Sequence, residues 1–318
     1  MSIILPTFNR REFLPAAVES IFAQTWTDWQ LIIADDGSDA DTRAYLEGLE
    51  DCPRVRLMCL PHTGRPSVVR NRALREARGQ YVAFLDSDDV WLPAKLALQI
   101  ASLRARSSCK WSYTKFVLVD ESGNPTAWAL RTGGWPTPSG WILEKLIRAE
   151  TSIALPTVVV SRELLEKIGG FDERLIGSED YELHLRLAQQ SEVIGITEPL
   201  TLVRRHTQHF SGQGVIPFES NLLIIDRLLR SERVEHLRDI LYQKRAEVAA
   251  GLARSHASAG HRGRAMRALA GSARHSWRYP RWWLAALETT ARALAPRSIA
   301  PSGNGLPQRA PRTRRGQR

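Results

Sequence analysis

Three carboxylates stand within four residues in the segment Asp86-Ser87-Asp88-Asp89, directly after an apolar run. Carboxylates this close repel one another unless a cation lies among them, and hard oxygen ligands suit Mg²⁺ or Mn²⁺. Such an ion would in turn hold a diphosphate. The pattern is also typical of a solvated acidic turn that caps a helix, here one expected from about Pro93. The segment alone leaves both interpretations open.

A similar arrangement occurs earlier, at Asp35-Asp36-Gly37-Ser38. A carboxylate after a strand can accept hydrogen bonds from a ribose hydroxyl or a base N–H, and Gly37 allows a tight turn. The alternative is a cap for the helix expected from about Asp41. The segment Gly64–Arg78 is a third candidate: a glycine precedes an arginine-rich helix, and the free backbone N–H groups at the start of that helix suit a phosphate. Most of its five arginines must face solvent, because they cannot all reach one ligand.

A fourth candidate is the pair Glu179-Asp180, which follows Gly169-Gly170-Phe171-Asp172 and precedes the helical run Leu183–Ala188. Adjacent carboxylates at a helix N-terminus cannot share a face. One of them can therefore take a proton from a hydroxyl nucleophile while the other has a structural role. A plain N-cap is the alternative.

The elements that position these residues alternate between strand and helix over the first 120 residues. This order predicts an α/β fold with right-handed crossovers and a mostly parallel, Rossmann-like sheet flanked by helices. Ligands bind such sheets at the C-terminal ends of the strands, which adds Thr7-Phe8-Asn9-Arg10 to the candidates. We expect strands at Ser2–Pro6, Trp29–Asp36, Val55–Leu60 and Tyr81–Asp86, and helices at Glu12–Gln24, Asp41–Leu49 and Ser67–Ala77.

The rest of the chain is organised differently. We expect an active-site loop at Thr132–Gly140, a strand at Thr157–Ser161 and a helix at Arg162–Ile168. From about Phe218 the pattern is helical, with a helix-turn-helix pair turning near Gly260 or Gly263. The predicted division is a first domain at 1–217, a C-terminal helical extension at 218–295 and a disordered basic tail at 296–318.

Composition excludes several classes of protein. Hydrophobic residues make up 43% and charged residues 25% of the 318, as in soluble globular proteins. No stretch is apolar enough to span a bilayer and no signal peptide precedes Ile3, so we expect a cytoplasmic protein. Three cysteines without ligand spacing predict no disulfide framework and no zinc site, and we expect reduced, mostly buried thiols.

Charge is distributed unevenly. Residues 1–203 carry 22 Lys and Arg against 27 Asp and Glu, whereas residues 204–318 carry 22 against 7. A basic second part suits phosphates of lipid headgroups or nucleic acid. Its aromatic residues cluster at 277–283 without a recognised nucleic-acid motif, so we expect no nucleic-acid partner. The apolar stripe after residue 280 either packs on the first domain or contacts an anionic membrane at the inner face of the cell membrane.

Together these features resemble family 2 glycosyltransferases with a GT-A fold. The resemblance covers roughly residues 1–210 and includes Ile4–Arg10, Asp35–Ser38, Arg70-Asn71, Phe84–Asp89 and Gly169–Asp172 ahead of Glu179-Asp180. It implies an inverting, hexosyltransferase-like enzyme that moves a sugar from a nucleoside diphosphate, such as a UDP-sugar, to a glycan or lipid-linked acceptor. The chain lacks a Gln-x-x-Arg-Trp segment, which favours single addition over processive synthesis.

The resemblance also implies a role for each matching residue. In the nucleotide site, Thr7, Phe8 and Arg10 would line the base pocket, Asp36 would bind base or ribose, and Arg70 would reach base or diphosphate. Asp86 would lie by the ribose and the metal, with Asp88 as the ligand of Mn²⁺ or Mg²⁺ and His206 as a third ligand. Asp180 would be the catalytic base, with Glu179 beside it in the acceptor site.

Two alternatives come from related functions. A sugar nucleotidyltransferase would carry a Gly-rich basic loop after the first strand, and Thr7-Phe8-Asn9-Arg10 lacks the glycines. A catalytically silent nucleotide-sugar-binding module could lose Asp88 or Asp180, and both are present.

Overall fold

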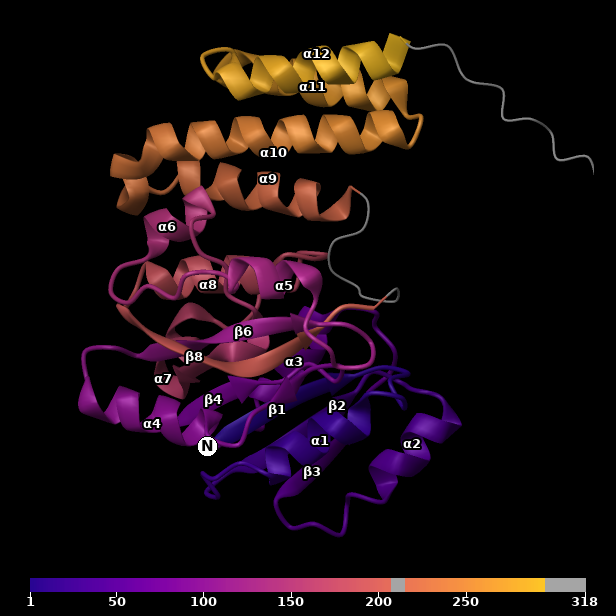
Figure 1. Ribbon diagram of the computed structural model, residues 1–318, viewed down its shortest axis with the longest axis vertical. Helices are drawn as coiled ribbons and strands as arrows, with labels where there is room; N and C mark the ends of the chain where they lie inside the picture. Colours follow the sequence, from indigo (N-terminus) through magenta and orange to yellow (C-terminus); the bar gives the residue numbers. More distant parts are fainter. Residues whose placement is uncertain (207–214, 295–318) are drawn as a thin grey trace, which may run out of the picture.

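The computed structural model describes residues 1–206 and 215–294, and in this part of the chain an eight-stranded sheet lies below a stack of C-terminal helices (Figure 1). The strands are β1 Ser2–Thr7, β2 Gln30–Asp35, β3 Val55–Cys59, β4 Tyr81–Phe84, β5 Val90–Trp91, β6 Trp111–Val119, β7 Val158–Ser161 and β8 Val193–Arg204. The helices are α1 Leu14–Phe22, α2 Ala40–Glu47, α3 Pro66–Leu74, α4 Lys95–Ala105, α5 Ala127–Thr132, α6 Leu143–Arg148, α7 Arg162–Ile168, α8 Glu179–Ala188, α9 Ile216–Leu229, α10 Arg238–Ser258, α11 Arg262–Ser276 and α12 Pro280–Leu294.

The sheet has the strand order β3-β2-β1-β4-β7-β6-β8-β5. Its first four strands are parallel to one another, β6 and β8 are also parallel, and β7 and β5 run antiparallel to their neighbours. The expectation of an α/β protein with a mostly parallel sheet is confirmed. Each strand and helix expected in the first 100 residues is present within two or three residues of its expected bounds.

Both faces of the sheet are buried, which explains why the early strands are almost wholly apolar. Along β1, Ile3 and Leu5 join one hydrophobic cluster, while Ile4 joins the other. Helices α1, α2 and α4 cover the first face, and α3, α6, α8 and α9 cover the second. The carboxyl ends of β1, β2 and β4 therefore open at one edge of a three-layer structure.

The C-terminal helices continue from the second face. Ile224 and Leu228 of α9 and Leu241 of α10 belong to the same cluster as the sheet residues. At Gly251 of α10, a Cβ atom would lie 2.3 Å from the ring of Phe218, so the missing side chain permits close packing of α9 on α10. The sequence pattern changes at about residue 217, but the packed core extends across that position.

Helices α10, α11 and α12 form a smaller core of their own, made by Ala246, Ala250, Ala253, Leu269 and Trp282. The turn between α10 and α11 contains Gly260 at φ +76°, one of the two glycines expected there. Residues 296–318, expected as a disordered tail, lie outside the described residues.

The α12 stripe packs on α10 and α11 through Trp282, whereas Trp283, Leu284 and Leu287 are exposed. The described residues include no helix with the length and apolar character needed to cross a membrane. Of the three cysteines only Cys109 is buried; Cys59 is exposed, so the expectation of mostly buried thiols was wrong. Cys59 ends β3, one of the two edge strands of the sheet, which explains its exposure.

Candidate active site

The first part of the site lies where β1 and β2 end. The ring of Phe8 stacks on His62, with centroids 4.1 Å apart, and Phe8 stays partly exposed. His62 Nδ1 lies 2.8 Å from the Asp36 carbonyl oxygen. The Asp36 carboxylate accepts hydrogen bonds from the amides of Thr63 and Gly64, at 2.8 and 2.9 Å. Asp36 thus fixes the 62–64 loop, which places His62 against Phe8 at the carboxyl edge of the sheet.

Thr7 and Arg10 lie at the same edge. Thr7 is buried, and its hydroxyl has no hydrogen-bond partner among the residues that the structure describes. The Arg10 carbonyl accepts from the amides of Phe13 and Leu14 and so begins the first turn leading into α1. The role of Thr7 and Arg10 in a nucleotide pocket stays a prediction.

The second part lies where β4 and β8 end. His206 Nε2 is 2.8 Å from Asp88 Oδ2, although the two residues are 118 positions apart. The ring of His206 also stacks on Phe13, with centroids 5.1 Å apart. Asp89 is buried and accepts from the Arg204 amide at 2.8 Å. Burial raises the pKa of Asp89 well above its ordinary value, and the charges of Asp88 and Asp86 raise it further.

The third part is the arginine that connects this acidic segment to α8. Arg70 is buried; its Nη2 donates to Asp86 at 2.6 Å and its Nη1 donates to Glu179 at 2.9 Å. Burial lowers the pKa of Arg70, but the charges of Asp86 and Glu179 more than offset that effect. Both terminal nitrogens therefore bind protein carboxylates. This geometry favours a positioning role for Arg70 over the direct contact with base or diphosphate that the sequence predicts.

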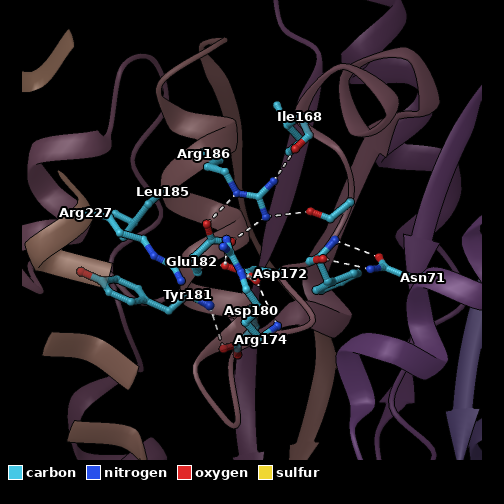
Figure 2. Close-up of polar contacts among 12 residues, drawn as sticks. Asn71, Ile168, Asp172, Arg174, Asp180, Tyr181, Glu182, Leu185, Arg186 and Arg227 are labelled. Carbon is cyan, nitrogen blue, oxygen red and sulfur yellow. Dashed lines mark hydrogen bonds and ion pairs between the residues drawn. The ribbon is translucent and has the colours of Figure 1, made fainter. Parts of the chain in front are cut away.

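Asn71, the next residue on α3, holds the segment before α8 (Figure 2). Its side-chain amide donates to the Phe171 carbonyl and its Oδ1 accepts from the Phe171 amide, both at 2.9 Å. A Cβ at Gly170 would lie 2.7 Å from Asn71 Oδ1, so this position requires glycine. Arg186 of α8 donates to the carbonyls of Ile168 and Gly170, each at 2.7 Å. The Gly169-Gly170-Phe171-Asp172 motif is therefore a scaffold for α8.

A cavity of about 610 Å³ adjoins this scaffold. Its cationic groups are already paired: Asp172 binds both Arg174 and Arg227, and Arg186 binds Glu182 (Figure 2). Burial and the Arg174 hydrogen bond oppose each other at Asp172, and the hydrogen bond prevails, so its pKa lies below the ordinary value. This network joins α9 to the segment before α8 through the contact of Arg227 with Asp172.

Asp180 stands at the start of α8. Gly177 and Ser178 both have left-handed backbone, at φ +83° and +58°, and turn the chain immediately before the helix. Asp180 Oδ1 accepts from the Tyr181 amide at 2.7 Å, and its side chain lines a cavity of about 290 Å³. Burial raises the pKa of Asp180, while the Tyr181 amide and Arg70 lower it in part. A carboxylate of raised pKa beside a cavity is suited to accept a proton.

The sequence-based candidates therefore fall into groups. Asp86, Arg70 and Glu179 form one ion-paired chain, and Asp88 lies with His206. The sequence analysis missed His62. Its position shortly after β3, at the carboxyl edge of the sheet, is the signal that could have identified it. Sequence reasoning also missed Arg204, whose Nε donates to the Asp88 carbonyl at 3.0 Å, because no sequence signal connects positions 116 residues apart.

The contacts of the acidic segment bear on metal ligation. Across residues 1–206 and 215–294, no group of three or more His, Cys, Asp or Glu side chains is arranged to hold an ion. Asp88 and His206 nevertheless place a carboxylate oxygen and an imidazole nitrogen side by side. Mg²⁺ commonly takes one or two protein ligands and completes its shell with phosphate oxygens and water. The donor set of this pair fits an ion that arrives with a diphosphate.

Two bacterial relatives resemble the chain over much of this region. The UDP-Glc:alpha-D-GlcNAc-diphosphoundecaprenol beta-1,3-glucosyltransferase WfgD of Escherichia coli is 29% identical over 196 residues, which is 62% of this chain and 72% of WfgD. The putative teichuronic acid biosynthesis glycosyltransferase TuaG of Bacillus subtilis is 38% identical over 126 residues, 39% of this chain and half of TuaG.

Solved structures share the fold at low sequence identity. S. aureus TarS 1-349 in complex with UDP-GlcNAc superposes with a TM-score of 0.62 at 17% identity, over 86% of this chain and 88% of TarS 1-349. The mannosyltransferase PcManGT from Pyrobaculum calidifontis, in complex with GDP-Man and Mn²⁺, has a TM-score of 0.57 at 17% identity, over 92% and 85% of the two chains. The model of the glycosyl transferase family 2 matches residues 2–163, just over half of the chain, and the protein belongs to that family.

Proposed function

We propose that the protein is an inverting, metal-dependent glycosyltransferase that moves a hexose from a nucleoside diphosphate, UDP in the first instance, to a hydroxyl of a glycan or lipid-linked acceptor. The observation that carries the proposal is the Asp86–Arg70–Glu179 chain of ion pairs. It joins the acidic segment suited to a diphosphate to the helix that starts with the candidate base. Donor and acceptor sites are thereby adjacent.

The donor end fits a nucleotide. Phe8 and His62 offer a stacked aromatic pair for a base, and the buried Thr7 hydroxyl can bond a polar group there. Asp88 and His206 would hold Mn²⁺ or Mg²⁺, which would offset the charge of the leaving diphosphate. UDP-GlcNAc in TarS and GDP-Man with Mn²⁺ in PcManGT support this choice by analogy of fold.

In this proposal the chain's own residues contribute one proton transfer and one positioning contact. Asp180 takes the proton of the acceptor hydroxyl as its oxygen attacks the anomeric carbon from the face opposite the diphosphate. The new C–O bond forms while the bond from that carbon to the diphosphate breaks, and the diphosphate leaves with the electron pair. The anomeric configuration inverts. Arg70 keeps Glu179, and hence the first turn of α8, beside Asp86 throughout.

We also propose that the protein works at the inner face of the cell membrane. Trp277, Trp283, Leu284 and Leu287 expose apolar side chains from the end of α11 and from α12, beside the exposed Arg278. Aromatic and apolar groups of this kind settle at the headgroup level, and basic residues favour anionic lipids. The lipid-linked sugar in the name of WfgD supports an acceptor that would be reached there.

The test is donor turnover. The full-length protein is incubated with UDP-glucose, UDP-N-acetylglucosamine or GDP-mannose and MnCl₂, and release of the nucleoside diphosphate is measured. We expect release from one donor, abolished by EDTA and by Asp180→Asn but not by Glu163→Gln, an exposed carboxylate on α7. Binding of donor without release in the wild type would instead favour a silent module. Formation of UDP-sugar and pyrophosphate from UTP and a sugar 1-phosphate would favour a nucleotidyltransferase.

A further inference from the structure

The 290 Å³ cavity beside Asp180 lies between the catalytic part and the C-terminal helices. Asp180 and His184 line it from α8, Asn221 from α9 and Lys244 from α10, and the ring of Trp135 lines it from the loop after α5. Its volume is close to the lower end of the range for small-ligand pockets. Residues from both parts of the chain therefore enclose one space next to the candidate base.

Two polar atoms in this lining lack partners. His184 Nε2 and Asn221 Oδ1 are buried, and neither has a hydrogen-bond partner within the described ranges of the chain. Burial lowers the pKa of His184 to about 3, so its ring is neutral at physiological pH. Unsatisfied buried polar groups are costly, and both of these border the same cavity. A hydroxyl group can donate to the amide oxygen and can either donate to or accept from the imidazole, depending on its tautomer.

The lining of the cavity also includes one cationic side chain, that of Lys244. Among its described lining residues, Asp180 and Lys244 carry the charges, because His184 is neutral. Lys244 Nζ lies 3.8 Å from Glu247 Oε2, one turn further along α10. At this distance the ion pair is loose. A lysine ammonium in this setting favours an anionic group on the ligand. Trp135 and Tyr181 add flat apolar surfaces of the kind that pack on sugar rings.

We propose that this cavity is the acceptor subsite and that it takes an anionic hexose: His184 and Asn221 bind its ring hydroxyls, and Lys244 binds its phosphate or carboxylate. The inference rests on the proposed function, because Asp180 must be the base that faces the acceptor. It goes further by giving α9 and α10 a role in acceptor choice. Asn221 and Lys244 both lie beyond residue 163, where the match to the family model ends.

The experiment measures hexose binding to the full-length protein saturated with UDP and MnCl₂, so that the donor site is occupied. Isothermal titration compares N-acetylglucosamine 1-phosphate with N-acetylglucosamine, and glucuronate with glucose. We expect one anionic sugar to bind about tenfold more tightly than its neutral counterpart, as one charge-assisted hydrogen bond would provide. The two arms tell a phosphate substituent from a carboxylate.

Three variants assign that preference. Lys244→Met should remove it, Lys244→Arg should keep most of it, and Asn221→Leu should weaken charged and neutral sugars alike. Lys167→Met, an exposed lysine on α7, is the matched control and should behave as the wild type. Melting curves of each variant with UDP confirm that the fold and the donor site persist.

The outcomes separate the inference from the proposal beneath it. Equal binding of charged and neutral sugars by the wild type, or an unchanged preference in Lys244→Met, would overturn the acceptor assignment while UDP binding stands. Absence of UDP binding would instead overturn the proposed function.

Discussion

Arg70 and Glu179 are joined by a 2.9 Å hydrogen bond across 109 residues of sequence. Glu179 is the residue before the candidate base, and the other side of the same guanidinium binds Asp86. One side chain thus joins the acidic segment to the first turn of α8, and under the proposed function its integrity should matter for both stability and catalysis.

Replacement of Arg70 by Met is the direct test. It leaves Glu179 without its cation in a buried place, which costs about 3 kcal/mol of unfolding free energy or more. Urea denaturation measures that loss, and Arg75→Met, an exposed arginine just after α3, should change it by less than about 0.5 kcal/mol. A near-neutral Arg70→Met would show that the two ion pairs do not hold α8.

Metal-dependent nucleotide binding should depend on Asp88. We expect MnCl₂ to strengthen UDP binding to the wild type and to have no effect on Asp88→Ala or His206→Asn, because each removes one of the two paired donors. Calorimetry with and without MnCl₂ measures this. Asp51→Ala, an exposed carboxylate far from the site in sequence, serves as the control. If Asp88→Ala keeps the full effect of MnCl₂, the ion binds elsewhere.

Asp180→Asn should lower turnover by about 10²-fold or more while donor affinity stays near that of the wild type. The wild-type pH profile adds a second readout. Because burial raises the pKa of Asp180, kcat/KM should fall on the acid side at a pH above the ordinary carboxyl value of 3.8. The base must be ionised, so activity is lost as the pH drops through that pKa. A variant that retains most of its turnover would move the base to another group.

Burial of Lys95 should lower the unfolding free energy of the protein at neutral pH. It is fully buried on α4, its Nζ donates to Gln99 at 2.8 Å, and burial holds its pKa well below the ordinary value. Folding therefore works against the charged form, so the cost is greatest below the folded pKa and disappears above pH 10.5. We expect Lys95→Met to raise the unfolding free energy by about 1 kcal/mol or more at pH 7, with the gain shrinking towards pH 10. A loss of stability at both pH values would contradict this.

Membrane docking should require the exposed apolar groups of α12. We expect the full-length protein to sediment with anionic vesicles at low salt but not with neutral vesicles. Substitution of Trp283, Leu284 and Leu287 by Ser should abolish this, while Leu130→Ser, equally exposed on α5, should not. Equal sedimentation of the triple variant would place the contact elsewhere in the chain.

The sequence predicted β1, β2 and β4 well because these strands are buried on both faces and nearly free of polar residues in their interiors. It did not predict β6 or β8. Ser112 and Thr114 alternate with apolar residues along β6 and are nonetheless fully buried, and β8 is interrupted by Glu198 and Pro199. The register of β6 on β8 shifts on either side of Lys115, which pairs with Pro199. In β6 the alternation stops at Lys115 and is followed by four apolar residues, and in β8 Glu198 and Pro199 interrupt the strand, so neither strand keeps a period-two pattern over its whole length.

Within the site, residue types were predictable and partners were not. Two of the acidic segments, Asp35–Ser38 and Asp86–Asp89, could be recognised because they follow apolar strands at the edge where parallel sheets bind ligands. That Asp36 would bind the 62–64 loop, or that Arg70 would bind two carboxylates, depends on distances that only the packed fold fixes. The part of the cavity wall formed by α9 and α10 was equally hard to predict, since Asn221 and Lys244 lie inside helices that carry no recognisable motif.

The two-sided burial of α10 has a consequence for how the molecule unfolds. Leu241 joins the main core, whereas Ala250 and Ala253 belong to a small cluster with Leu269 of α11 and Trp282 of α12, in which alanines are the commonest residues. Hydrophobic stabilisation scales with buried apolar area, so the terminal helix pair is a weaker cooperative unit than the sheet. Amide hydrogens of α11 and α12 should therefore exchange with solvent through a local opening that leaves α10 and the sheet folded.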